Sequence, residues 1–186
     1  MSHAASITAE YRPFPNEGGR NWRQEHIEIP LMLRALHLPR GARMLEVGCG
    51  RGVALPPLAR HLAPARLVGL DVDGSLLAEA GQRLRETATR AELVVGDVRR
   101  LPFPDCDFDV VIDFGTCFHV ARPDDALREI ARVLAAGGIF ATETRLGQLL
   151  SHPLRARGRF LPWESVSAFE RRSRAGLWQS CRRCSA

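Results

Sequence analysis

The stretch Gly48-Cys49-Gly50-Arg51-Gly52 constrains this chain most, because three glycines at alternate positions follow a short, largely apolar run. The run, residues 42–47, is typical of a β-strand, and the residues after Gly52 have a helical pattern. A strand, a glycine turn and a helix bring backbone N–H groups to a ligand at the helix N-terminus. A Cβ atom in the turn would block close approach or forbid its geometry. The stretch predicts a βα turn, either an ordinary one or one that binds a ligand.

The rest of the chain alternates short apolar strands with helices. Strands are expected at residues 67–70, 93–95, 108–114 and 139–144. Ser75 is the expected cap of one helix, and Gly137-Gly138 is the expected end of another that Pro123 opens. Upstream, residues 21–38 have helical spacing that Pro30 must kink or split. This alternation favours an α/β fold with a doubly wound, mostly parallel sheet.

Length and charge predict one domain in three parts. These are an N-terminal arm and helix (1–40), an α/β core (41–144) and a basic C-terminal part (145–186). Nine of the 26 arginines follow Thr144, against only two acidic residues, so the net charge of +5 comes from this last part. Such a segment can face an acidic partner, or it can be a solvated basic edge.

Several protein classes are disfavoured by the sequence. No apolar stretch reaches the roughly 18 residues of a membrane span, and residues 1–11 lack a signal-peptide pattern. The five cysteines are an odd number without a disulfide framework, which favours a reducing compartment. We therefore expect a cytoplasmic protein. Cys181 and Cys184 have CxxC spacing, but a single pair is a weak zinc signal, and we expect no metal.

The strand ends carry the residues that predict a ligand. In a parallel sheet, ligands bind outside the carboxyl ends of the strands. Asp71 ends the second strand, 19 residues beyond Gly52, where a carboxylate can accept bonds from ribose hydroxyls. A dinucleotide motif would have a third glycine where Val53 stands, and Glu46 beside the turn suits an ammonium group better than a pyrophosphate. This favours S-adenosylmethionine (SAM) over a dinucleotide.

Five segments in order are similar to the class I SAM-dependent methyltransferases, specifically the small type 11 methyltransferase domain. The resemblance covers roughly residues 41–144. Its segments are Glu46 to Gly52, Gly69 to Asp73, Gly96-Asp97 with Leu101-Pro102-Phe103, Phe108 to Val111, and Arg132 to Gly138. The resemblance implies a Rossmann-like fold and SAM as the cofactor.

The resemblance also implies roles for individual residues. The backbone of Gly48 and Gly50 would hold the methionine part of SAM, Glu46 its amino group and Asp71 the ribose diol.

Further implied contacts lie along the same edge. Val72 would pack on the adenine, Asp97 would meet its amino group beside the Val98 backbone, and Phe114 with Gly115 would line the methyl end.

The C-terminal end departs from the family pattern. A helix at 163–174 and one strand at 175–184 are expected, with no room for the family's last strand. We therefore expect a shortened, six-stranded sheet, or a partner that completes it, including a homo-oligomer through the open sheet edge.

Methyl transfer from a sulfonium needs alignment, a dry pocket and, for some acceptors, a base. His119 is the first candidate for that base, although a lone histidine can instead cap a helix or contact the cofactor. Glu143 is the second, with a buried carboxylate paired to an arginine as the structural alternative. Phe14, Trp22, Phe160 and Trp163 could form an aromatic substrate wall or anchor the core.

The leading hypothesis is an enzyme that methylates a small-molecule or lipid-like acceptor. Two alternatives stay open: an RNA methyltransferase that uses the arginine-rich part on phosphates, and a non-catalytic SAM-binding partner subunit. Because the chain lacks the aromatic and basic repeats of an RNA-binding module, nucleic acid is not the expected partner.

Overall fold

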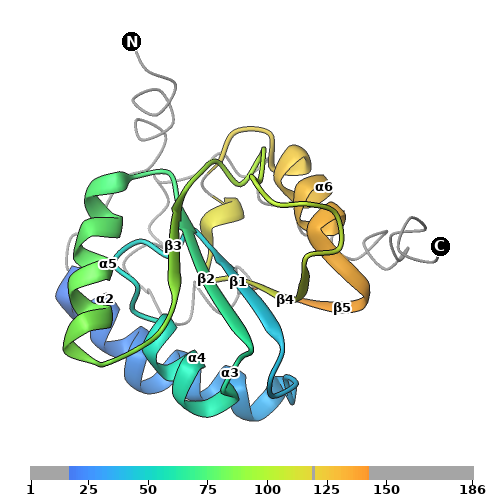
Figure 1. The fold of residues 1–186 in the computed structure, drawn as a ribbon. Coiled ribbons are helices and arrows are strands. Elements are labelled where there is room, and N and C mark those ends of the chain that lie inside the picture. The colour runs from blue at the N-terminus through green and yellow to red at the C-terminus, as the bar shows by residue number, and fades with distance from the viewer. Residues whose placement is uncertain (1–16, 119, 143–186) are drawn as a thin grey trace, which may run out of the picture.

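The computed structural model describes residues 17–118 and 120–142 and contains one five-stranded sheet (Figure 1). Its strand order is β3-β2-β1-β4-β5, and every pairing is parallel. The strands are β1 (Arg43–Val47), β2 (Arg66–Asp71), β3 (Glu92–Val95), β4 (Phe108–Asp113) and β5 (Leu134–Thr142). The prediction of a doubly wound parallel α/β sheet is therefore confirmed. The expected helix at 163–174, the sixth strand and the basic part lie outside the described residues.

Helices cover both faces of this sheet (Figure 1). They are α2 (Glu17–Arg23), the π-helix η1 (Gln24–Glu28), α3 (Ile29–Leu36), α4 (Leu55–Leu62), α5 (Gly74–Glu86), the 3-10 turn η2 (Thr116–Phe118) and α6 (Pro123–Val133). One core cluster joins the sheet to α6, and a second joins its other face to α3, α4 and α5. No helix in the described ranges is both long and apolar enough to span a bilayer.

Alternation along each strand assigns side chains to these two faces. Leu45 and Val47 belong to the α6 cluster, whereas Met44 belongs to the cluster on the α4 face. Since side chains alternate along a strand, Glu46 projects to the same face as Met44. In the paired register, Val47 lies opposite Asp113 of β4, so these two side chains share the α6 face. The two buried carboxylates therefore lie on opposite faces of the sheet.

The N-terminal helical segment divides where the sequence predicts. Pro30 occupies the first turn of α3, directly after the π-helical turn η1. Proline lacks the N–H that a continuous α-helix needs, and its ring crowds the preceding turn. The division at Pro30 is thus confirmed, and it takes the form of a wider turn within one helical segment.

Two expected helix boundaries were wrong. The cap of α5 is Asp73 rather than Ser75, because Asp73 Oδ1 accepts bonds from the Ser75 amide (2.8 Å) and hydroxyl (2.6 Å). Helix α6 ends at Val133, and Gly137-Gly138 lie within β5. Leu134 is already extended and pairs with Phe108, before a register shift in that pairing. Pairing with β4 overrides the local glycine signal.

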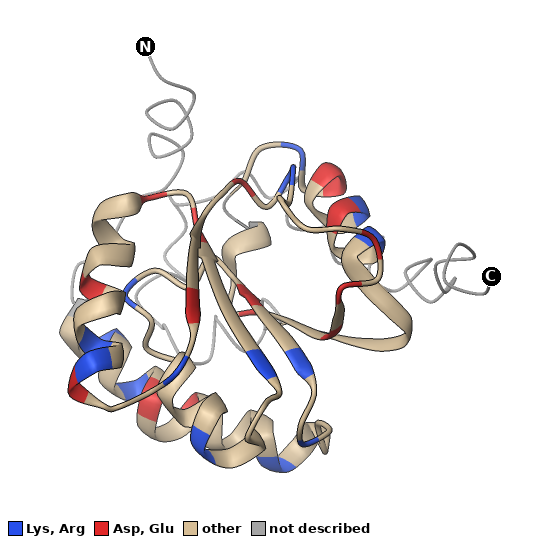
Figure 2. Cartoon of the chain, viewed as in Figure 1, with Lys and Arg blue, Asp and Glu red and all other residues tan. Residues whose placement is uncertain are grey.

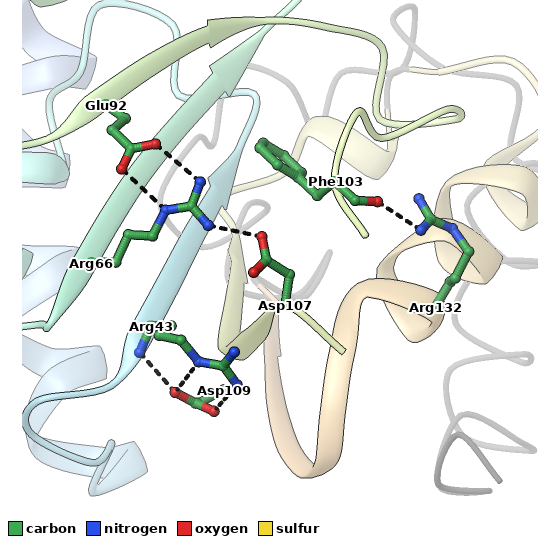
Figure 3. A network of polar contacts seen from close by, with 7 residues as sticks. All are labelled: Arg43, Arg66, Glu92, Phe103, Asp107, Asp109 and Arg132. Carbon is green, nitrogen blue, oxygen red and sulfur yellow. Dashed lines mark hydrogen bonds and ion pairs between the residues drawn. The ribbon is translucent and has the colours of Figure 1, made fainter. Parts of the chain in front are cut away.

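Ion pairs fix the amino ends of the strands (Figure 3). Arg43 binds Asp109 through two side-chain nitrogens, at 2.7 and 3.1 Å. Arg66 binds Glu92 at 3.0 Å and Asp107 at 2.8 Å. These contacts join β1, β2, β3 and β4 at the edge opposite the glycine turn.

A third arginine fastens α6 to the loop before β4. Arg132 donates to the carbonyl of Phe103 at 2.7 Å (Figure 3). It also donates to the carbonyl of Leu101 (2.9 Å) and pairs with Glu129 (2.7 Å). At its other end, α6 opens with Asp124 and Asp125, where acidic side chains suit the helix dipole (Figure 2).

Three of the cysteines fall within the described residues. Cys49 and Cys117 are free and buried, whereas Cys106 is disulfide-bonded.

Candidate functional site

Two glycines of the turn after β1 have positive φ angles but different surroundings. Gly48 has φ +66°, and a Cβ there would lie 1.8 Å from the Thr116 hydroxyl oxygen. Gly50 has φ +51°, and a Cβ there would meet no atom of residues 17–118 or 120–142 within 4 Å. Gly48 is therefore required by close packing with η2, whereas Gly50 borders open space. A ligand has room to approach the backbone at Gly50.

Asp71 ties the end of β2 to this turn. Its Oδ2 accepts a hydrogen bond from the Gly50 amide (2.8 Å), and its Oδ1 accepts one from the Asp73 amide (2.9 Å). The residue is only 8% exposed, and burial raises the pKa of Asp71 while these amide bonds oppose the rise. Each carboxylate oxygen can accept more than one bond. Asp71 can therefore hold the turn and still bind hydroxyl groups.

Glu46, in β1, has a buried carboxyl group with unmet bonding capacity. The residue is 3% exposed, and among the described residues its Oε2 has no hydrogen-bond partner. Burial first, and then the negative charges of Asp71 and Asp113, raise the pKa of Glu46 to about 8, while Arg20 lowers it. Buried polar groups are normally satisfied, so this oxygen indicates a missing donor. A cationic donor such as an ammonium group fits it best.

Asp97 is already engaged with a residue that the sequence reasoning did not consider. Its carboxylate pairs with the side chain of Arg99 (Nη2 to Oδ2, 3.0 Å), and its Oδ1 accepts from the Arg99 amide (2.9 Å). Arg99 also donates to the carbonyl of Ala121, at 3.3 Å. Any adenine contact of Asp97 would share the carboxylate with Arg99. Spacing in the sequence gave no signal for this pair.

Three apolar residues that the sequence places at the site differ in burial. Val98 is 4% exposed, and its side chain belongs to the core cluster on the α6 face. Val72 is half-buried, directly after Asp71. Phe114 is half-buried and packs against the cluster on the α4 face. Val98 can therefore offer only its backbone to a ligand, whereas Val72 and Phe114 keep part of their side chains accessible.

Sequence reasoning missed Asp113, the last residue of β4. It is fully buried, and it accepts bonds from the amides of Thr116 (2.6 Å) and Cys117 (3.4 Å) and from the Thr142 hydroxyl (3.2 Å). The available signal was an acidic residue at the end of an apolar strand, the same pattern that identified Asp71.

Cys49 lies inside the glycine turn and has a packing role. A Cβ on Gly69 would come within 2.9 Å of its Sγ, and burial raises the pKa of the Cys49 thiol. A thiol whose pKa is raised stays protonated and is a poor nucleophile. This agrees with the expectation that Cys49 is not catalytic.

The structure brings Glu46, Gly48, Gly50 and Asp71 together at the carboxyl ends of β1 and β2. Both candidate bases, His119 and Glu143, lie outside the described residues, as do Phe14, Phe160 and Trp163. Trp22 is 58% exposed on α2 and stacks on His26, with 5.0 Å between ring centroids. Trp22 is therefore not a core anchor.

Comparison with known proteins identifies the family of this chain. A family model described as a methyltransferase domain matches residues 45–142, more than half of the chain. The chain belongs to this methyltransferase domain family. The match runs from β1 to the end of β5 and includes the glycine turn and Asp71.

Two curated relatives share this region. A fatty-acid O-methyltransferase of Mycolicibacterium smegmatis is 42% identical over 100 residues, which is 54% of this chain and 36% of that protein. A phosphatidylethanolamine N-methyltransferase of Cereibacter sphaeroides is 36% identical over 114 residues, which is 60% of this chain and 55% of that protein. The chain thus spans about a third to a half of the length of these relatives.

A solved structure has the same fold. The crystal structure of the cyclase SpnF matches with a TM-score of 0.60 and 32% identity, and the match covers 69% of this chain and 48% of that one. The methyltransferase-like, Rossmann-like fold class is therefore confirmed.

Proposed function

We propose that this chain binds SAM at the carboxyl ends of β1 and β2 and transfers its methyl group to a lipid-like acceptor. The single observation that carries the proposal is the Glu46 carboxyl group, which is buried, has an oxygen without a hydrogen-bond partner in the described part of the chain, and neighbours the open turn at Gly50. A ligand with a donor group, and preferably a cation, would satisfy that oxygen.

The residues at this edge fit the parts of SAM. Glu46 would receive the amino group of the methionine end, beside the backbone of Gly48 and Gly50. Asp71 would accept bonds from the ribose hydroxyls through its remaining lone pairs. Glu46 and Asp71 make this edge acidic. A dinucleotide motif would have a third glycine at the position where Val53 stands.

The adenine and methyl ends would involve neighbouring residues. Val72 would pack on the adenine, and the Val98 backbone would lie beside it. Asp97 would bind the adenine amino group while it keeps its ion pair with Arg99. Phe114 would line the methyl end with an apolar surface that excludes water.

Bound SAM would supply a methyl group on an activated sulfonium, ready for in-line displacement. The chain's own residues then need to orient the cofactor and exclude water from the acceptor. We propose His119 as the group that takes a proton from a hydroxyl or protonated amine acceptor, with Glu143 as the second candidate. A carboxylate acceptor would need no such base.

The names of both curated relatives support a lipid-like acceptor, since one refers to a fatty acid and the other to a phospholipid. The exposed surface of the N-terminal helical segment is compatible with it. Trp22 and Leu31 are each 58% exposed there.

A methyl-transfer assay tests the proposal directly. The protein would be incubated with SAM and, separately, a long-chain fatty acid, phosphatidylethanolamine vesicles and an RNA oligonucleotide, with products detected by mass spectrometry. Methylation of a lipid substrate, strongly reduced in Asp71→Ala and retained in Asp109→Asn, is the expected result. Methylation of only the RNA would overturn the lipid-like acceptor. Binding of SAM without turnover on any acceptor would support the partner-subunit alternative.

The role of His119 has its own test. His119→Ala should lower kcat by about a hundredfold or more if the acceptor carries a proton, and leave the Kd for S-adenosylhomocysteine nearly unchanged. Loss of both affinity and turnover would instead make His119 a cofactor contact. No loss of either would remove it from the site.

A further inference from the structure

Asp113, at the end of β4, accepts hydrogen bonds from two other elements of the fold. Its carboxylate is fully buried and gathers three donors from two other elements: the amides of Thr116 and Cys117 in η2, and the hydroxyl of Thr142 in β5. Burial raises the pKa of Asp113, while the donors oppose the rise. A buried carboxyl group is costly unless it is bonded in this way.

Thr116 carries the effect of Asp113 to the glycine turn. While its amide donates to Asp113 at 2.6 Å, its side chain fills the space that a Cβ on Gly48 would occupy. The Thr116 hydroxyl also lies 3.5 Å from the Gly48 carbonyl oxygen, as a long hydrogen bond. The position of residues 114–118 is thus coupled to the turn beside Glu46.

We infer that Asp113 is a positioning residue: its carboxylate holds residues 114–118 against the Gly48 turn and ties them to β5 through Thr142. The consequence for catalysis rests on the proposed function, since residues 114–118 include Phe114 at the methyl end. The positioning itself is measurable without cofactor or acceptor. Asp113 does not face the ligand, because it projects to the α6 face, opposite Glu46.

The test compares two aspartates at opposite ends of β4. Asp113→Asn replaces one acceptor oxygen with a donor that faces other donors, whereas Asp109→Asn weakens the ion pair with Arg43 at the far edge. Amide hydrogen exchange of residues 114–118 should accelerate by about tenfold or more in Asp113→Asn and by less than about twofold in Asp109→Asn. Unchanged exchange in Asp113→Asn, or equal acceleration in both, would overturn the inference.

Ligand affinity gives a second readout. The Kd for S-adenosylhomocysteine should rise by about tenfold in Asp113→Asn and stay within about twofold in Asp109→Asn. If exchange accelerates but affinity stays the same, Asp113 positions the loop without serving the site, and the functional part is wrong. If the wild-type chain binds no S-adenosylhomocysteine, the proposed function fails while the exchange result still decides the positioning role.

A milder pair of variants keeps the test decisive if Asp113→Asn does not fold. Thr142→Val removes one donor to the carboxylate, whereas Thr142→Ser retains the hydroxyl. Exchange of residues 114–118 should accelerate in the valine variant and be restored to the wild-type rate in the serine variant. Equal rates in both variants would overturn the link between Asp113 and β5.

Discussion

The Gly50 amide donates a 2.8 Å hydrogen bond to Asp71 Oδ2, so the glycine turn and the end of β2 form one unit. The two residues lie 21 positions apart in the chain, and each helps to place the other. Substitution of Asp71 therefore changes both a ligand contact and the support of the turn.

Asp71→Ala should weaken binding of S-adenosylhomocysteine by about 1–3 kcal/mol, because it removes charged hydrogen bonds to ribose and frees the Gly50 amide. Isothermal titration calorimetry measures the change. Asp107→Ala is a matched control, because Asp107 pairs with Arg66 at the opposite edge of the sheet. Equal affinity in wild type and Asp71→Ala would mean that Asp71 does not contact the ligand.

The pKa of about 8 at Glu46 predicts pH-dependent binding. Below that pH the free chain holds a proton on Glu46, which a bound ammonium group must displace. Affinity for S-adenosylhomocysteine should therefore rise as pH increases toward 8, by at most about tenfold per pH unit. Titrations at about pH 6 and about pH 8 measure this, with Glu46→Gln expected to bind weakly and with a flatter pH dependence. A flat wild-type profile would contradict the role of Glu46.

The same carboxyl group should cost stability at high pH. Its pKa is raised in the folded chain from an ordinary 4.5 to about 8, so the unfolded chain loses the proton first as pH rises. The contribution of Glu46 to stability is therefore full below about 4.5 and is lost as pH rises through 8.

Glu46→Gln removes that pH-dependent cost. The unfolding free energy of Glu46→Gln minus that of wild type should increase by at least about 1 kcal/mol from acidic to mildly alkaline pH. Urea unfolding of both proteins at the two pH values measures this change. An identical difference between the two proteins at all pH values would show that folding does not raise the pKa of Glu46.

Alanine at the two glycines should separate packing from ligand access. Gly48→Ala should cost about 3 kcal/mol of unfolding free energy or more, because its Cβ would overlap Thr116 at a positive φ. Gly50→Ala should cost only about 1–2 kcal/mol, since it has the φ strain alone. Thermal unfolding measures the difference, and Gly50→Ala should fold yet lose affinity for S-adenosylhomocysteine. Retained affinity in Gly50→Ala would place the ligand elsewhere.

Arg132→Ala should lower the unfolding free energy by about 1–3 kcal/mol, because the carbonyls of Leu101 and Phe103 and the carboxylate of Glu129 lose their donor. Chemical denaturation measures the loss. Affinity of the folded variant for S-adenosylhomocysteine should match that of wild type, since Arg132 is remote from the glycine turn. A parallel loss of affinity would show that α6 also supports the site.

The sequence predicts the sheet and the glycine turn well, because both depend on local patterns. Apolar runs mark the strands, and three glycines at alternate positions mark the turn after β1. The helix boundaries at Ser75 and Gly137 were wrong, because a neighbouring aspartate and pairing with β4 compete with local signals.

Side-chain partners were the part of the site that the sequence could not predict. Asp97 looked like a free carboxylate, yet it pairs with Arg99. Asp113 looked like part of an apolar strand, yet it joins β4, η2 and β5 through Thr116 and Thr142. Such contacts depend on how separate segments meet in space, and spacing along one chain does not encode them.

We propose that the acidic, glycine-lined edge beside Glu46 binds SAM. Calorimetric titration of the purified chain with S-adenosylhomocysteine, and with NAD⁺ as the control ligand, measures this binding. We expect a dissociation constant on the order of micromolar for S-adenosylhomocysteine and no detectable heat of binding with NAD⁺. Binding of NAD⁺, or no binding of S-adenosylhomocysteine at any accessible concentration, would contradict it.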